Sequence, residues 1–307
     1  MASSIGGNGL LRYIKRNNAL YIMLIPGIIF FLLFKYLPMA GLIIGFQDYN
    51  PYKGFMDSEW VGLKWFIRFF SQRQFTRVLW NTLIINIYQL VFAFPAPIIL
   101  ACLLNELRNL KFKRTVQTIA YLPHFLSWSI IFGLAFMLLS QETGLLNQVI
   151  TAFGGKSVAF LQKPDYFRTI IISAQIWRDM GWGTIIFLAA LAGISPALYE
   201  SATIDGAGRW KQFLYITFPG LLPAIMILML LNIGRIMDLG FEQIWVFLNP
   251  LTYETGEVLE TYIYRWGVVE GKYSFTTAVG LFKSLIGLIM VVIANKTSRK
   301  VTGESLF

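Results

Sequence analysis

Residues 199–208 read Tyr199-Glu200-Ser201-Ala202-Thr203-Ile204-Asp205-Gly206-Ala207-Gly208, a short polar stretch set between two long apolar segments. Its small side chains allow another surface to approach the backbone closely, and Gly206 permits a turn that a Cβ atom would resist. Pro219 and Pro223 follow near the start of the next apolar run, where a helix tolerates proline best. The pattern predicts a polar loop between two helices that a second protein can contact.

The neighbouring apolar segments belong to a set of six, each long enough to cross a bilayer as a helix of about 20 residues. They cover residues 19–46, 79–104, 115–139, 169–194, 216–241 and 275–294. Of the 307 residues, 56% are hydrophobic and 14% are charged, and the mean hydropathy is +0.60. Because soluble domains carry about 25% charged residues, the sequence predicts an all-α, polytopic transmembrane helical bundle with six spans.

The first apolar segment follows Arg12, Lys15 and Arg16, as the core of a signal peptide would. It is much longer than a signal-peptide core of roughly 7–15 residues, and no A-x-A-like cleavage site follows it. We therefore interpret it as a retained first helix. Residues 1–18 are then a cytoplasmic N-terminal segment, and residues 19–307 form the membrane domain.

The charge distribution predicts how the chain is oriented. The expected inner segments (1–18, 105–114, 195–215 and 295–307) hold 12 Lys and Arg residues and 4 acids, whereas the expected outer segments (47–78, 140–168 and 242–274) hold 10 of each. This positive-inside bias places both termini in the cytoplasm of a multi-pass protein of the cell membrane. The same distribution argues against nucleic acid as the reason for the net charge of +10.

The expected outer segments are long and rich in aromatic residues. In the first of them, Trp65, Phe66, Phe69 and Phe70 recur at helical spacing. This spacing predicts an amphipathic helix that lies either on the membrane surface or against the bundle. We also expect residues 48–54 and 252–271 to meet an extracytoplasmic partner, because they combine aromatic and acidic residues.

Several motifs together resemble a known family. The polar loop is similar to the EAA loop, usually Glu-Ala-Ala-x-x-x-Gly with a downstream Ile-x-x-Pro, although Ser201 replaces the first alanine. The other motifs are Phe46-Gln47-Asp48-Tyr49-Asn50-Pro51 with Trp60-Val61-Gly62-Leu63, Leu122-Pro123-His124-Phe125-Leu126-Ser127-Trp128, and the tail Gly303-Glu304-Ser305-Leu306-Phe307. Over about 260 residues the chain thus resembles the permease subunits of binding-protein-dependent sugar ABC importers, in their oligosaccharide and polysaccharide branch.

The resemblance implies a transport subunit that works inside a larger assembly. The implied partners are a second homologous permease, two ATPase subunits that bind ATP and Mg, and an extracytoplasmic sugar-binding protein. Loop 195–215 would contain the cytoplasmic coupling helix that docks into the ATPase. The residues that the resemblance assigns to this coupling are Glu200, Ser201, Ala202, Asp205, Gly206, Ala207 and Gly208.

The sequence offers no catalytic site. Phe153-Gly154-Gly155-Lys156-Ser157 resembles the end of a P-loop, but Ile150 stands where the motif needs its first glycine. His124 is the only histidine and Cys102 the only cysteine, which excludes an intrachain disulfide and a zinc site with two histidines or several thiolates. We therefore expect no enzymatic activity and no metal in this chain.

Polar residues inside the spans are the candidate substrate contacts, because a charge in the bilayer usually faces a bundle interior or a cavity. The candidates are Asn86, Gln89, Gln175, Arg178, Asp179, Asn232, Arg235 and Asp238. Asn232, Arg235, Asp238 and Glu242 are spaced three, three and four apart, which predicts one helical stripe. The charges either line a translocation path or form ion pairs, notably with Lys283, that hold the bundle together.

Two other functions remain open from the sequence. One is an ABC permease for a non-sugar solute, and the other is an ATP-independent secondary transporter or channel. The aromatic outer segments favour sugars, since aromatic rings pack on the C–H faces of sugar rings. The EAA-like loop favours dependence on an ATPase. The sequence does not name the sugar.

Overall fold

The computed structural model describes residues 16–234, 237–238 and 240–302, and it is almost entirely helical there. The helices are α2 (Asn18–Phe31), α3 (Leu37–Met39), α4 (Lys64–Ser71), α5 (Arg73–Tyr88), α6 (Pro95–Glu106), α7 (Leu110–Tyr121), α8 (Trp128–Leu139), α9 (Leu145–Ala152), α10 (Pro164–Ala192), α11 (Pro196–Ile204), α12 (Arg209–Gln212), α13 (Phe218–Gly234), α14 (Phe241–Phe247), α15 (Tyr253–Gly256), α16 (Leu259–Tyr264) and α17 (Tyr273–Thr302). Short strands β1 (Gln47–Asp48) and β2 (Glu59–Trp60) pair antiparallel. The predicted all-α class is confirmed.

Several helices continue into tighter or wider turns. π-Helical turns occupy Leu32–Tyr36, Gln89–Ala93, Phe213–Thr217 and Arg265–Val269. Turns of 3-10 helix occupy Ala40–Phe46, Leu122–Phe125 and Pro250–Thr252. Arg12, Lys15, Arg235 and the tail motif at 303–307, all singled out in the sequence, lie outside the described residues.

The described ranges contain four continuous helices that are long and apolar enough to cross a membrane: Asn18–Phe46, Arg73–Glu106, Arg209–Gly234 and Tyr273–Lys296. Two further candidate spans are bent helix pairs. Leu110–Phe125 meets Trp128–Leu139 at 105°, and Pro164–Ala192 meets Pro196–Ile204 at 67°. Counting each bent pair as one span gives the six spans that the sequence predicts.

The bend in the third span was not expected from segment 115–139. Pro123 has no N–H to continue the helical ladder, and the chain turns into an extended backbone at Leu126 and Ser127. The Ser127 hydroxyl then accepts a hydrogen bond from the N–H of Ile130 at 3.4 Å, which starts α8 in a new direction.

The fifth span is shorter than predicted, and the predicted stripe is wrong. α13 ends at Gly234 and α14 begins at Phe241, so segment 216–241 is not one helix. Asn232 therefore lies on α13 and Glu242 on α14, while Asp238 lies in the connection between them. Arg235, the fourth member, lies outside the described residues.

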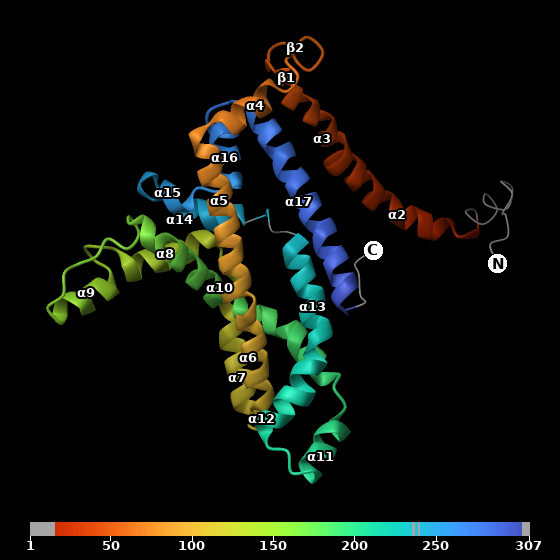
Figure 1. The fold of residues 1–307 in the computed structure, drawn as a ribbon, viewed down its shortest axis with the longest axis vertical. Helices are drawn as coiled ribbons and strands as arrows, with labels where there is room; N and C mark the ends of the chain where they lie inside the picture. Colours follow the sequence, from red (N-terminus) through yellow and green to blue (C-terminus); the bar gives the residue numbers. More distant parts are fainter. Residues whose placement is uncertain (1–15, 235–236, 239, 303–307) are drawn as a thin grey trace.

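The spans form an elongated bundle with two distinct ends (Figure 1). The hairpin end carries β1, β2 and α4, and the opposite α11 end carries α11 and α12 (Figure 1). α2 reaches away from the bundle and has no buried residue. α4 is the predicted amphipathic helix, and it packs against the bundle: Phe69 is 1% exposed and contacts Phe275 and Phe282 of α17.

Candidate functional site

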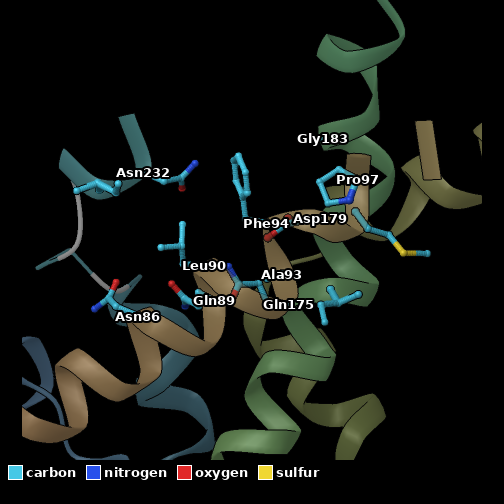
Figure 2. Close-up of a pocket in the computed structure, with 13 residues that line it drawn as sticks. Asn86, Gln89, Leu90, Ala93, Phe94, Pro97, Gln175, Asp179, Gly183 and Asn232 are labelled. Atoms are coloured by element: carbon cyan, nitrogen blue, oxygen red, sulfur yellow. The ribbon is translucent and has the colours of Figure 1, made fainter. Parts of the chain in front are cut away.

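A cavity of about 220 Å³ opens about midway between the two ends of the bundle. Three spans supply its walls: α5 with its continuation into α6, α10, and the end of α13. Figure 2 shows the polar side chains converging on this space from the three helices. The lining residues are Asn86, Gln89, Leu90, Ala93, Phe94, Pro97, Gln175, Ile176, Asp179, Met180, Gly183, Asn232 and Ile233.

The local backbone at the cavity departs from a regular α-helix. In the π-helical turn Gln89–Ala93 the N–H of Phe94 donates to the carbonyl of Gln89 at 2.8 Å, and such turns often occur at functional sites. Pro97 then removes a donor that an unbroken helix would provide for the carbonyl of Ala93. Gly183 lets α10 approach closely, since a Cβ there would lie 2.8 Å from Pro97.

The amides around the cavity are already oriented by hydrogen bonds. Asn86 is 7% exposed, and its Nδ2 donates to the carbonyl of Thr82 at 2.7 Å. Gln175 accepts from Gln243 Nε2 at 3.4 Å, and Asn232 Nδ2 donates to a carbonyl one turn earlier at 2.8 Å. Amides both donate and accept, so these side chains provide directed hydrogen bonds for a polyhydroxylated ligand.

Asp179 is the charged side chain among the lining residues that the structure describes. Its Oδ1 lies 2.9 Å from Nδ1 of His124 and 3.2 Å from Nη1 of Arg178. Arg178 turns away from the cavity: its guanidinium lies 4.7 Å from the centre of the Trp128 ring, and Nε donates to the Leu126 carbonyl at 3.4 Å. The Arg178 cation therefore balances the Asp179 charge from outside the cavity.

Five of the eight predicted substrate contacts line the cavity, namely Asn86, Gln89, Gln175, Asp179 and Asn232. Asp238 does not, because its Oδ1 pairs with Lys283 Nζ at 2.6 Å, in the ion pair that was the alternative interpretation. Lys283 also pairs with Glu260 at 2.7 Å. In the part of the chain that the structure describes, no group of three His, Cys, Asp or Glu side chains could hold a metal ion.

A buried ion cluster near the hairpin end was not expected from the sequence. The side chain of Glu257 is 0% exposed and lies 3.2 Å from Arg77 Nη2 and 3.0 Å from Arg265 Nε. Asn81 donates to the carbonyl of Glu257 at 3.1 Å and accepts from Arg168 Nη2 at 2.7 Å. Part of the predicted outer segment 252–271 is therefore packed inside the bundle. The sequence signal for this burial is weak: Glu257 is followed by the apolar residues Val258 and Leu259.

The EAA-like loop forms α11, α12 and the turn between them at the α11 end (Figure 1). Gly206 has a φ of +74°, and the Ala207 N–H donates to the Ala202 carbonyl at 2.8 Å, which closes the helix end. Gln212 Nε2 ties the turn to Ala207 O at 3.1 Å. Of the predicted coupling residues, Ala202 and Ala207 are half-buried, while the exposed ones are Glu200, Ser201, Asp205, Gly206 and Gly208. The loop is thus preformed and accessible.

Comparison with known proteins identifies the family. The sequence model of the family described as 'binding-protein-dependent transport system inner membrane component' matches residues 93–303 of this chain. Protein LplB of Bacillus subtilis (strain 168) is 46% identical over 294 residues, covering 96% of this chain and 92% of that protein. The polygalacturonan/rhamnogalacturonan transport system permease protein YteP of the same organism is 46% identical over 298 residues, covering 97% and 93%.

The fold agrees with this assignment. A chain in the crystal structure of a bacterial alginate ABC transporter, in complex with an alginate pentasaccharide-bound periplasmic protein, superposes with a TM-score of 0.90. The two chains are 42% identical, and the match covers 97% of this chain and 99% of the other. This protein therefore belongs to the family of binding-protein-dependent transport system inner membrane components.

Proposed function

We propose that this chain is the membrane permease subunit of an ABC importer that passes an oligosaccharide through the amide-lined cavity. The observation that carries the proposal is the convergence of Asn86, Gln89, Gln175 and Asn232 on one space between the ends of the bundle. The relatives add support, since YteP is named for polygalacturonan and rhamnogalacturonan and the structural relative transports alginate. Hydroxyl-rich chains of this kind suit a wall of amides.

In importers of this family the ATPase is a separate subunit, so the chain is a transport subunit and not an enzyme. A second homologous permease, two ATPase subunits and a binding protein complete the assembly. ATP, with Mg, binds in the ATPase subunits. Closure of the ATPase dimer opens the permease outward to receive the sugar, and hydrolysis returns it to the inward-open state.

The α11 end is the end we assign to the cytoplasm. Its exposed acids and small residues suit close contact with an ATPase surface, and the turn at Gly206 is held in one conformation by the hydrogen bonds around it. This orientation places both termini in the cytoplasm, as the positive-inside bias predicts. Residues 195–215 then form the coupling loop within a single permease domain at 19–307.

The hairpin end is the end we assign to the binding protein. Tyr52 is 98% exposed at the tip of the hairpin, within the predicted contact region 48–54. In region 252–271, Tyr262 is 1% exposed and cannot contact a partner, whereas Val268 and Val269 are exposed. The exposed surface in that region is therefore limited to Glu254 and the turn before α17.

Uptake into proteoliposomes tests the proposal. The complete assembly is reconstituted with ATP inside the vesicles and loaded binding protein outside, and it is offered oligogalacturonate, alginate oligomers, a neutral oligosaccharide and an amino acid. ATP-dependent uptake of an oligosaccharide supports the proposal. Uptake of the amino acid alone, or sugar uptake that needs no ATP, would refute it.

A further inference from the structure

His124 is held between two side chains that α10 presents on one face. Its Nδ1 lies 2.9 Å from Asp179 Oδ1. Its ring stacks on the ring of Trp182, with 4.6 Å between centroids and an interplanar angle of 4°. A carboxylate only accepts hydrogen bonds, so Nδ1 must carry the hydrogen and donate it. Two contacts thus fix both the position and the tautomer of the imidazole.

The sequence creates this arrangement through one close helix crossing. A Cβ at Gly181 would lie 2.0 Å from the carbonyl oxygen of Ala120, so α7 and α10 touch backbone to backbone there. α7 ends at Tyr121, next to that crossing, and the chain continues as a 3-10 turn that contains the buried Pro123. This turn carries His124 directly beside Asp179, just before the chain bends by 105° into α8.

The two contacts of Asp179 leave one face of its carboxylate toward the cavity. His124 and Arg178 both reach Oδ1, and Asp179 lines the cavity with its side chain 36% exposed. Oδ2 is therefore the oxygen that a ligand in the cavity can use. Arg178 also offsets the charge of the carboxylate, which lowers the repulsion that an anionic sugar would otherwise meet.

We propose that His124 is a positioning residue for substrate recognition, which holds the Asp179 carboxylate so that Oδ2 accepts hydrogen bonds from sugar hydroxyls. The proposal rests on the proposed oligosaccharide transport and adds a specific acceptor to the amide wall. Without His124, Arg178 alone orients the carboxylate, and Arg178 is itself drawn away toward Trp128 and the Leu126 carbonyl. Asp179 then loses the geometry that suits the substrate.

Two matched variants separate the hydrogen bond of His124 from its ring stacking. His124→Asn keeps an N–H donor near the position of Nδ1 and loses the ring. His124→Phe keeps a ring to stack on Trp182 and loses the donor. We expect sugar uptake per ATP hydrolysed to fall about tenfold or more in His124→Phe, the size typical of a lost hydrogen bond to a charged group, and to stay within about threefold of wild type in His124→Asn.

A double-mutant cycle with Asp179→Ala, which removes the acceptor of His124, provides the decisive comparison. If His124 acts only through Asp179, adding His124→Phe to Asp179→Ala causes no further loss of uptake per ATP. Additive losses would overturn the proposal. So would an equal loss in His124→Asn and His124→Phe, or a fall in thermal stability in which uptake and ATPase activity decline together.

The experiment distinguishes failure of the His124 proposal from failure of the proposed function. A wild-type assembly that transports a solute other than an oligosaccharide refutes the proposed function. The same cycle, measured with the solute that is transported, still reports whether His124 acts through Asp179. Additive losses in a wild-type background that transports oligosaccharides refute the positioning role alone.

Discussion

The buried cluster around Glu257 allows a sharp prediction about stability. Glu257→Gln keeps the shape of the side chain but removes the charge that faces Arg77 and Arg265. Because the Glu257 side chain is 0% exposed, water does not reach this position to replace the carboxylate as the partner of the two arginines. Removing one partner of a buried ion pair costs about 3–5 kcal/mol. Arg77 is 38% exposed and partly regains water, so we expect the lower end of that range, about 3 kcal/mol.

The assay is thermal unfolding of the purified complex, with wild type and variant in the same detergent. A loss of this size corresponds to a fall in Tm of roughly 5–10 °C for a chain of this length. Asp48→Asn is the matched control, since its pair with Lys64 is exposed, with side chains 48% and 50% accessible. Such pairs contribute about 0–1 kcal/mol. A Glu257→Gln variant as mild as the Asp48→Asn control would refute the reasoning.

Three further predictions concern the coupling turn, a buried acid and a helix crossing. Gly206→Ala, at a φ of +74°, should cost about 1 kcal/mol and reduce ATPase stimulation by loaded binding protein. Gly154→Ala, at a φ of +79° outside the coupling loop, should cost similar stability but leave that stimulation unchanged; an equal loss of stimulation would contradict this. Burial raises the pKa of Glu260, so its contribution to stability is complete below pH 4.5 and is lost as the pH rises through the raised pKa. The Tm of wild type, measured relative to that of Glu260→Gln, should therefore fall as the pH rises through the raised pKa of Glu260. Curves of Tm against pH that run parallel for the two proteins would contradict this prediction. Gly181→Ala should reduce the yield of assembled complex several-fold on a membrane blot, because its Cβ would lie 2.0 Å from a backbone oxygen of α7, while Gly133→Ala, with open space around it, should not; similar yields would reject the close crossing.

The membrane helices and much of the cavity could be predicted from the sequence because one physical rule governs both. The bilayer demands long apolar helices, so hydropathy alone locates the spans. A polar side chain inside such a helix avoids lipid, so Asn86, Gln89, Gln175 and Asn232 had to face an interior space. The structure brings these four to one cavity. Which apolar residues complete the wall, such as Phe94 and Pro97, depends on helix packing that no single segment encodes.

The end of the fifth span was predicted wrongly because hydropathy does not report where a helix stops. Gly234 and Gly240 flank the connection between α13 and α14, and two glycines on either side of a short stretch that contains Arg235 and Asp238 were a usable sign of a break. A regular spacing of polar residues across that stretch suggested a helix instead. The stripe from Asn232 to Glu242 was a consequence of that error.

The environment of His124 and Glu257 depends on contacts between distant parts of the chain. His124 and Asp179 are 55 residues apart, and Glu257 and Arg77 are 180 apart. An acid within a span, such as Asp179, does predict that some cationic or donor side chain lies nearby. The sequence alone could not select His124 as that partner. Glu257 stands in a polar segment, where an acid ordinarily indicates exposure to water.

The most direct test of the central claim is whether a group attached in the cavity stops transport. In a Cys102→Ala background, Asn232→Cys places a single thiol in the cavity wall, and Gln148→Cys places one on the exposed surface of α9. A bulky water-soluble thiol reagent should abolish ATP-dependent oligosaccharide uptake in the Asn232→Cys complex, and transported sugar should slow the labelling. The Gln148→Cys complex should be labelled without losing uptake. Full uptake by labelled Asn232→Cys would contradict a sugar path through this cavity.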